Sequence, residues 1–495
     1  MFEKFSRKKY VWAFSTYFTE GFPFSLIRTV SGVFFRDLKV SLESIGLTSL
    51  FGLPWILKFF WAPLLDRYST KRKWLLVMQG SLCLLMFLVA FIVPLDSSLQ
   101  IIATLLFGGA ILSATHDTAI DGYYLEALDE NDQAKYVGYR VMAYRIAMMT
   151  GTGVIVTIGT VYSWFFAYLA AASIFSLFFI FHLFALKEVQ KTEQTFKEML
   201  RGILNAKVLL FSFLAALFII LLRWFFNSVI VLKLKNKYTF LNSIHFSHWI
   251  GIILLLSLLL LALTRNKIKK VLLKNRESNY ARSFLTFVDR DQFSLILIFI
   301  IFLRAGEFML TTMVSPFIVD LGIKNHYGRI SAGIGLPCSI GGAILGGWLI
   351  SRFSLKKVAF PFLLFQNSTN LVYMGLAFYL RPWIIQNTGA DSPLSPGIFN
   401  ISLVASTHGI EQFSGGMGTA VLMAFLMRLC KKEFKASHYA IGSGLMAVSG
   451  VFAGLSSGIF AGWLGYGWMF FISFVAALPA LAIIPFLSFE RVTES

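Results

Sequence analysis

The sequence predicts an all-α polytopic membrane protein, and three observations carry that prediction. Of the 495 residues, 57% are hydrophobic and only 14% are charged. The mean hydropathy is +0.71. The apolar residues also gather in runs of about 20, the length that a helix needs to cross the hydrocarbon core of a bilayer. A chain this apolar cannot hide its side chains in one water-exposed globule, so a single soluble domain is excluded.

The apolar runs predict about fourteen transmembrane helices joined by short connections. The first follows Lys4, Arg7 and Lys8 as a signal peptide would, but it contains Glu20 and lacks a small-residue cleavage pattern, so we expect it to be retained. The predicted spans are 10–35, 45–65, 75–94, 98–121, 138–160, 164–186, 207–228, 248–264, 292–320, 327–350, 358–380, 397–428, 437–462 and 465–488.

Positive charge predicts the orientation, because Lys and Arg are held on the cytoplasmic side of a membrane. With the N-terminus inside, the cytoplasmic segments collect 31 of the 44 Lys and Arg residues, and the outer loops collect 8. Both termini are therefore predicted to be cytoplasmic. The net charge of +19 follows from this topology, with anionic lipid headgroups at the cytoplasmic face as the partner and no role for nucleic acid.

Two short motifs recur at an offset of about 285 residues and predict an internal repeat. Leu65-Asp66-Arg67 with its basic tail is matched by Ile350-Ser351-Arg352, and Gly52-Leu53-Pro54 by Gly335-Leu336-Pro337. We therefore expect a pseudo-symmetric transporter with a six-helix half at 1–190, a linker at 191–290 and a second six-helix half at 291–495. The linker holds the apolar runs 207–228 and 248–264, which are either a transmembrane hairpin or a pair lying partly in the interface.

Small residues and cysteines give further expectations. Gly450, Gly454, Gly458 and Gly462 recur every four residues, which predicts a smooth helix face for close packing, either static or sliding during transport. The three cysteines lie far apart without His or Cys at metal-ligand spacing. Neither a disulfide framework, nor a metal site, nor a cofactor is therefore predicted.

Charged residues inside a membrane need a partner, an aqueous cavity or a function, because each costs at least ~2.5–3.5 kcal/mol at mid-depth. Asp117 and Asp121 stand one helical turn apart, so they can share one cavity face and bind a proton. The alternative is an ordinary acidic helix end in the headgroup region. Lys58 and Arg145 are the expected counter-charges, either in a plain buried ion pair or in direct contact with substrate.

Several other polar residues within the spans predict a central cavity. Glu20 and Arg28 are about 80° apart around the first helix, so they can face one cavity without touching. Arg304 and Glu307, three residues apart, are expected to pair, and Glu411 is the remaining mid-span carboxylate. Such a cavity, with Tyr17 and other aromatic residues nearby in sequence, can stack sugar rings or bury peptide side chains. His116, His408 and His438 are more typical of hydrogen-bonded structural histidines.

A set of segments resembles the AmpG-type muropeptide permeases of the major facilitator superfamily. The second-span signature is Gly46-Leu47-Thr48-Ser49-Leu50-Phe51-Gly52-Leu53-Pro54 with Leu57-Lys58-Phe59-Phe60-Trp61-Ala62-Pro63-Leu64-Leu65-Asp66-Arg67-Tyr68, and Ser113 to Asp121 is similar to the fourth-span motif. Tyr144-Arg145, Gly306-Glu307 and the run from Gly415-Gly416-Met417-Gly418 to Tyr439 complete the set. The resemblance covers about 1–186 and 292–488 and leaves the inserted hairpin uncovered.

This resemblance implies a major facilitator fold and proton-driven import of cell-wall recycling fragments, the anhydro-muropeptides, across a bacterial inner membrane. It implies polar cavity residues at Lys58, Asp117, Asp121, Arg145, Glu307 and Glu411. Asp66, Arg67 and Arg352 are expected to form a cytoplasmic gate. His116, Glu307 and Ser351 depart from the family pattern, which leaves open another solute such as a peptide, a siderophore or an acyl-CoA.

Two other classes of function remain as alternatives. Asp117 and Asp121 echo the Asp-x-x-x-Asp motif of prenyltransferases, in which carboxylates hold magnesium pyrophosphate, but a second acidic cluster is missing from the sequence. The second alternative is a receptor or scaffold that binds solutes without moving them across the membrane. The repeat and the charges within the spans favour a transporter over an enzyme.

Overall fold

The structure is a computed structural model, and its described part is helical, without a strand. It describes residues 9–188 and 263–489 apart from gaps at 59–60, 62–64, 66–68, 96–97, 129, 274–278, 291, 388–392 and 431–434, with isolated positions between 198 and 260. The predicted inserted hairpin at 207–228 and 248–264 lies almost entirely outside the described residues. Seven helices in the described part are long and apolar enough to cross a membrane by length and composition.

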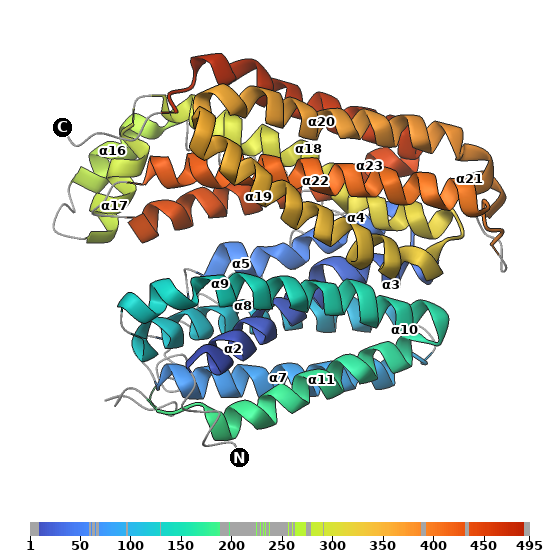
Figure 1. Cartoon of the computed structure of the whole chain (residues 1–495), viewed down its shortest axis with the longest axis horizontal. Coiled ribbons are helices and arrows are strands. Elements are labelled where there is room, and N and C mark those ends of the chain that lie inside the picture. Colours follow the sequence, from blue (N-terminus) through green and yellow to red (C-terminus); the bar gives the residue numbers. More distant parts are fainter. Residues whose placement is uncertain are drawn as a thin grey trace. The chain divides into compact units, whose positions relative to one another are not determined.

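The chain divides into two compact units, and the first comprises residues 1–30 and 54–249. Its long helices α2, α7, α8, α9 and α11 pack along one another (Figure 1). The elements of this unit are α2 (Lys9–Ser25), η1 (Leu26–Val30), α5 (Leu53–Leu57), α7 (Lys71–Ile92), α8 (Leu99–Ala127), α9 (Glu130–Met149), η4 (Thr150–Ile155), α10 (Val156–Val161) and α11 (Trp164–Ala185).

Local sequence explains where these helices begin and where two of them change their winding. Thr70 and Ser163 have extended backbones, and their hydroxyl oxygens accept from the backbone N–H groups of Lys73 and Phe166. The π-helical turns η1 and η4 pack against each other. Gly151 in η4 lies so close to Ser25 that an added Cβ would overlap its side chain. Glycine therefore lets the two turns approach next to the polar residues of α2, α8 and α9.

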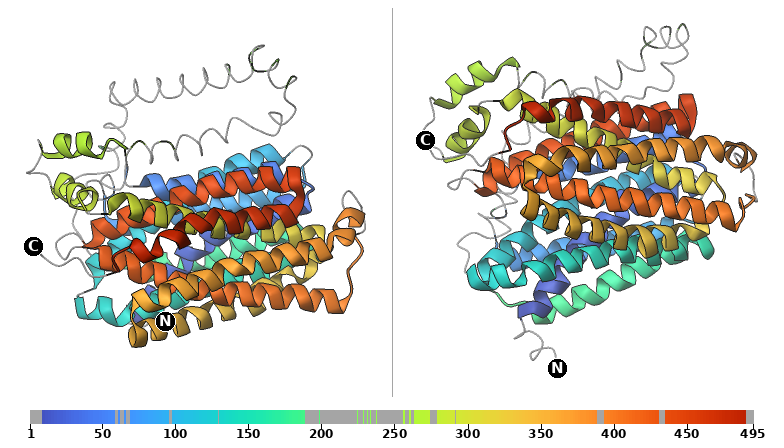
Figure 2. Two further views of the ribbon diagram at one scale, coloured as in Figure 1. Left: turned by 90° about the horizontal axis from the view of Figure 1, so that it is seen from above. Right: turned by 45° about the horizontal axis from the view of Figure 1, so that its top comes forward.

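The second unit comprises residues 31–53 and 250–495. Its long helices α18, α20, α22 and α23 run lengthwise beside one another (Figure 2). The elements are α3 (Ser31–Asp37), α4 (Leu42–Gly46), η2 (Leu47–Gly52), α16 (Arg265–Leu273), α17 (Asn279–Val288), α18 (Phe293–Asp320), η6 (Lys324–His326), η7 (Arg329–Gly335), α19 (Leu336–Phe353), α20 (Leu355–Tyr379), α21 (Arg381–Asn387), α22 (Ile398–Leu429), α23 (Lys435–Ile483) and η9 (Ile484–Phe486). Within α23, Gly465 has a non-helical backbone with φ +81, which places a break where the sequence predicts one span to end and the next to begin.

A polar cluster that the sequence did not predict fixes residues 31–53 within this unit. The Arg36 guanidinium donates to both carboxylate oxygens of Asp320 at 2.5 Å. The Tyr466 hydroxyl donates to Asp320 at 2.7 Å, and Lys324 pairs with Asp37. Two oxygens and two parallel N–H groups make a bidentate ion pair, the most directional kind that Arg forms. A segment from the early part of the chain is thereby joined to helix α18.

The glycine-lined face of α23 packs as the sequence predicts. A Cβ on Gly458 would overlap the backbone oxygen of Leu42 and lie 3.0 Å from Cα of Gly46, and a Cβ on Gly462 would overlap the carboxylate of Glu43. Close packing of α4 on α23 therefore depends on the missing side chains. The structure supports the packing interpretation and leaves sliding during transport as a prediction.

The two Gly-Leu-Pro motifs both lie where the helix type changes, although the preceding turns differ, and the repeat itself stays a prediction. The 3-10 helix η2 ends at Gly52, and α5 begins at Leu53. The π-helix η7 ends at Gly335, and α19 begins at Leu336. Both Gly-Leu-Pro motifs therefore mark a change of helical winding, and Pro is tolerated there because a first-turn N–H needs no intrahelical acceptor.

We predict that Gly458→Ala destabilises the protein by about 1–3 kcal/mol, because its Cβ meets backbone atoms that cannot rotate away. Thermal unfolding of the detergent-purified protein measures the effect. The matched control is Gly444→Ala on the same helix, where an added Cβ has nothing within 4 Å and should leave stability unchanged or raise it. Equal effects of the two substitutions would contradict the packing role.

Candidate transport site

An ion pair between Lys58 and Asp117 begins the polar site of the first unit. Lys58 follows directly on α5, and its Nζ lies 2.5 Å from Oδ2 of Asp117 on α8. The Lys58 side chain is 34% exposed and that of Asp117 is 12% exposed, so the pair opens to one side. Lys58 is therefore the counter-charge of Asp117, as the sequence predicts. The neighbouring Trp61 donates its indole N–H to Thr115 at 3.1 Å and ties the same segment to α8.

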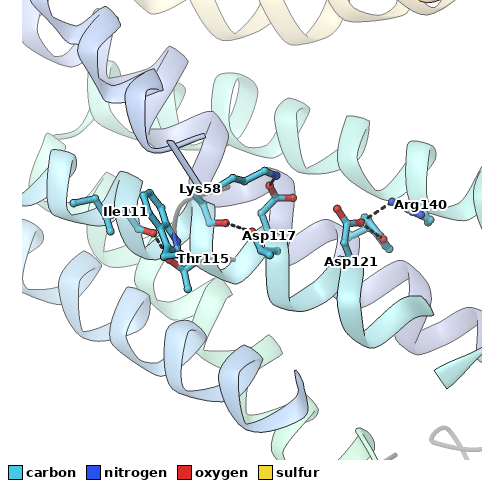
Figure 3. A network of polar contacts seen from close by, with 10 residues as sticks. Lys58, Ile111, Thr115, Asp117, Asp121 and Arg140 are labelled. Atoms are coloured by element: carbon cyan, nitrogen blue, oxygen red, sulfur yellow. Dashed lines mark hydrogen bonds and ion pairs between the residues drawn. The ribbon is translucent and has the colours of Figure 1, made fainter. Parts of the chain in front are cut away.

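Asp121 stands one turn further along α8 and has its own partners. The Tyr17 hydroxyl donates to Oδ1 at 2.7 Å, and Nη2 of Arg140 on α9 donates to the same oxygen at 2.8 Å. The Arg140 guanidinium also lies over the Tyr17 ring, 4.0 Å from its centroid. Figure 3 shows the two carboxylates on one side of α8, with Lys58 beside Asp117 and Arg140 beside Asp121. Each aspartate thus has a cation of its own.

The remaining predicted residues of this unit lie around the two pairs. Glu20 on α2 is an electrostatic neighbour of Asp117 and Asp121, and among the described residues its buried Oε2 has no hydrogen-bond partner. Arg28 lies in the π-turn η1 and interacts with Tyr144. Tyr144 is therefore an electrostatic neighbour of both Glu20 and Arg28, and no ion pair between these two residues is observed in the described part of the chain. Arg145 also lies near Tyr144, but the ion pair to Asp121 comes from Arg140.

His182 and His116 of the first unit differ in their hydrogen bonding. His182 is fully buried, with Nδ1 2.9 Å from Gln79 Oε1 and Nε2 2.9 Å from Ser15 Oγ. Both ring nitrogens of His116 are buried, and neither has a hydrogen-bond partner among the described residues, so the prediction of a hydrogen-bonded histidine is wrong at this position. Across the residues that the structure describes, no group of three or more His, Cys, Asp and Glu is placed to hold a metal ion.

The polar site of the second unit begins with Arg304 and Glu307 on α18. The two side chains form an ion pair within one turn, as the sequence predicts. Gln366 on α20 donates to the same Glu307 oxygen at 3.0 Å. Glu307 also lines a small cavity of about 10 Å³, which is room for about one water molecule. The other polar residues of its wall are Gln366, Asn367, Thr369, Asn370 and Glu411.

Glu411 on α22 also lines that cavity and is almost fully buried, at 5% exposed. Gln412 donates to its Oε2 at 3.0 Å, and the same oxygen lies 3.5 Å from Nδ1 of His408, one turn earlier on the helix. The hydroxyl of Tyr373 on α20 lies 2.9 Å from that nitrogen. Glu411 and His408 therefore share an enclosed polar pocket within the second unit.

The predicted gate is described only in part. Asp66 and Arg67 lie outside the described residues. Arg352 near the end of α19 is exposed, with its guanidinium 5.5 Å from the ring centroid of Trp348. Lys71, at the start of α7, donates to the backbone oxygen of Leu65 at 2.8 Å, so the basic end of the first gating motif is tied to its own loop. The gating role stays a prediction.

Sequence reasoning missed Arg140, Gln366 and Tyr373. Arg140 stands at the edge of the fifth predicted span, 138–160, where a cation is expected to face the headgroups, whereas α9 begins at Glu130 and carries Arg140 well inside a helix. Gln366 and Tyr373 lie seven residues apart on α20, hence on one face. That spacing is the signal by which they can be found.

The comparisons with known proteins agree with this architecture. The family model described as Major Facilitator Superfamily matches residues 13–248. An anhydromuropeptide permease of Escherichia coli is 23% identical over 480 residues, which cover 94% of this chain and 77% of the relative. A Rickettsia conorii protein that carries the AmpG name is 23% identical over 94% of both chains. Just under half of the chain, residues 13–248, is therefore similar to the major facilitator superfamily.

Solved structures agree on the fold. A crystal structure of the peptide transporter POT superposes with a TM-score of 0.65 at 10% identity and covers 98% of both chains. The nucleoside transporter NupG gives a TM-score of 0.57 at 13% identity over 96% of this chain and 98% of its own. At this identity the likeness shows the fold alone. The protein is a multi-pass membrane transporter with the major facilitator fold, as the sequence predicts, whereas the number of its spans stays a prediction.

We predict that Arg140 and Asp121 are energetically coupled and that Arg145 and Asp121 are not, because the ion pair with Asp121 and the stacking on Tyr17 belong to Arg140. A double-mutant cycle of Arg140→Gln with Asp121→Asn, read by thermal unfolding, should give a coupling energy of about 1 kcal/mol.

The control cycle replaces Arg145 on the same helix by Gln and should give a coupling energy near zero. A larger coupling for Arg145 than for Arg140 would show that the counter-charge of Asp121 has been assigned to the wrong residue.

Proposed function

We propose that the protein imports anhydro-muropeptides, the sugar-peptide fragments of cell-wall recycling, together with protons by alternating access. One observation carries the proposal. Carboxylates occur within the spans of both units, held in ion pairs or enclosed polar pockets, in a chain that is similar over 94% of its length to an anhydromuropeptide permease. Charge at these depths is retained for transport because its cost is otherwise avoidable.

The geometry supports a mechanism in which proton binding and ion pairing compete. A proton on Asp117 weakens its attraction to Lys58, and a proton on Asp121 weakens its attraction to Arg140 and frees the guanidinium. The released cations are then able to bind the carboxylates of an incoming peptide fragment. In this proposal Asp117, Asp121, Glu307 and Glu411 carry coupling protons, while the charge partners and substrate contacts are Lys58, Arg145, Glu20, Arg28, Arg304 and Tyr17.

Aromatic and amide side chains suit a substrate with sugar and peptide parts. Tyr17 and Tyr124 pack edge to face beside Arg140, with ring centroids 5.6 Å apart. Both rings are 2% exposed in this structure, so in this proposal a sugar ring reaches them only after Arg140 is released and the site opens. The second unit supplies amides at Gln366, Asn367 and Asn370. A small peptide is the second candidate solute, because the solved structures with this fold include the peptide transporter POT.

The cellular setting is proposed from the same relatives and from the charge distribution. We place the protein in a bacterial inner membrane with both termini in the cytoplasm. The exposed residues Lys267 and Lys270 of α16 would then face anionic lipid headgroups. Asp66, Arg67 and Arg352 would close the cytoplasmic side, and the halves 1–190 and 291–495 would move about the site.

The test is uptake of an anhydro-muropeptide into proteoliposomes with an imposed pH gradient, acidic outside. The wild type should accumulate the solute, and the gradient should accelerate uptake. Asp121→Asn should abolish that acceleration because an amide cannot carry the proton. Unlabelled dipeptides and nucleosides, added as competitors, define the solute class.

The matched control is Asp289→Asn, which alters an aspartate paired with Lys269 outside the long apolar helices. Gradient-driven uptake should be unchanged in that variant. Undiminished acceleration in Asp121→Asn would show that Asp121 is not on the proton path. If wild-type vesicles exclude the anhydro-muropeptide but take up dipeptides, the substrate is a peptide and the proposed substrate is wrong.

A further inference from the structure

The side chain of Gln366 joins three helices of the second unit. It belongs to α20, and its Nε2 donates to Oε2 of Glu307 on α18 at 3.0 Å. On its other side the amide lies against Gly418 of α22. Gln366 is only 9% exposed, so these contacts with the protein, rather than bulk water, fix the position of the amide.

Gly418 provides the space that the amide occupies. A Cβ added at this glycine would lie 1.7 Å from Oε1 of Gln366 and 2.5 Å from its Cδ, far inside van der Waals contact. Even the methyl group of alanine would therefore push the amide away from Glu307. The direction of the amide follows from chemistry, because an ionised carboxylate only accepts hydrogen bonds, so the NH₂ end faces Glu307 and the carbonyl end faces Gly418.

The two oxygens of Glu307 have different surroundings. Arg304 and Gln366 both donate to Oε2, and among the residues that the structure describes no donor reaches Oε1. The Glu307 side chain is 21% exposed and lines the water-sized cavity, so water can reach the carboxyl group. Oε2 is therefore held by the protein, and Oε1 is left for a proton.

A neutral donor suits a carboxyl group that changes its charge. The C=O of a carboxylic acid accepts hydrogen bonds as a carboxylate does, so Oε2 stays bound to both donors after Oε1 takes a proton. Gln366 adds a donor without adding charge, whereas a second cation at this place would favour the ionised form. In the described part of the chain, the charged or titratable groups that act on Glu307 are Arg304 and Glu411, and the residues that α20 and α23 place in the cavity wall are not titratable.

We propose that Gln366, placed against Gly418, is a positioning residue for Glu307 and directs the coupling proton to Oε1. In this step an O–H bond of a hydrated proton breaks and an O–H bond forms at Oε1, which leaves a water molecule behind. Oε2 keeps its hydrogen bonds from Gln366 and Arg304, so the carboxyl group stays in place while its charge changes. This inference rests on the proposed proton coupling and deepens it.

The first test needs no solute. A double-mutant cycle combines Gln366→Met, which keeps the length of the side chain without its donor, with Glu307→Gln and is read by thermal unfolding of the purified protein. The unfolding equilibrium constants should depart from additivity by at least about threefold, the lower end of coupling between residues in contact. Additive effects in the folded variants would show that Gln366 does not hold Glu307 and would overturn the proposal.

The second test separates positioning from structural support through the pH profile of gradient-driven uptake of an anhydro-muropeptide into proteoliposomes. Gln366→Met removes a donor that binds a carboxylate more strongly than an acid, so half-maximal uptake should need a roughly fivefold lower external proton concentration. Gln366→Lys adds a cation beside Glu307 and should raise the required concentration at least roughly tenfold. Loss of structural support alone does not shift the profile in opposite directions. Shifts in the same direction, or no shift in either variant, would overturn the proposal.

Gly418→Ala should reproduce the shift of Gln366→Met, because the added Cβ displaces the amide while residue 366 is unchanged. The matched control is Gly375→Ala on α20, where an added Cβ has nothing within 4 Å, and its pH profile should match that of the wild type. A wild-type profile in a folded Gly418→Ala protein would overturn the proposal. If the wild type shows no gradient-driven uptake at all, the proposed proton coupling fails, and the double-mutant cycle still decides whether Gln366 holds Glu307.

Discussion

The free-energy cost of an ionised side chain inside a membrane governs how the polar residues of this structure are arranged. An ionised side chain in the hydrocarbon region must be paired, hydrated or neutralised, and the described ion pairs follow this rule. Lys58 with Asp117 and Arg140 with Asp121 satisfy it in the first unit, and Arg304 with Glu307 satisfies it in the second. A proton or a charged solute can also disturb these pairs, because either one changes the charge that each partner meets. The same ion pairs that lower the cost of burial are therefore the groups that respond to protons and solute.

Close packing is the second requirement, because polar groups can leave the lipid only where helices approach one another. Glycines permit that approach at both sites. Gly151 brings η4 against Ser25 beside the first site, and Gly335 lets η7 lie on the imidazole of His408. Gly418 similarly faces the amide of Gln366, which reaches Glu307. The smallest residues therefore surround the most polar ones.

The sequence was sufficient wherever an interaction stays within one helix or depends on a strong charge. The pair of Arg304 and Glu307 follows from a spacing of three residues, and the glycine face of α23 from a spacing of four. Lys58 could be assigned to Asp117 because few other cations lie within the spans. Contacts between helices depend on how each helix is rotated about its axis, which no local pattern records. For that reason Arg140, Tyr373 and the bidentate pair of Arg36 with Asp320 were not predicted.

In the proposed mechanism, solute and proton enter together. This coupling can be tested by following the internal pH of proteoliposomes with an enclosed pH-sensitive dye while an anhydro-muropeptide is added outside in the absence of any imposed gradient. Coupled entry predicts that the solute acidifies the interior and that its omission does not. Entry of the solute, measured in the same vesicles, without any change of internal pH would contradict it.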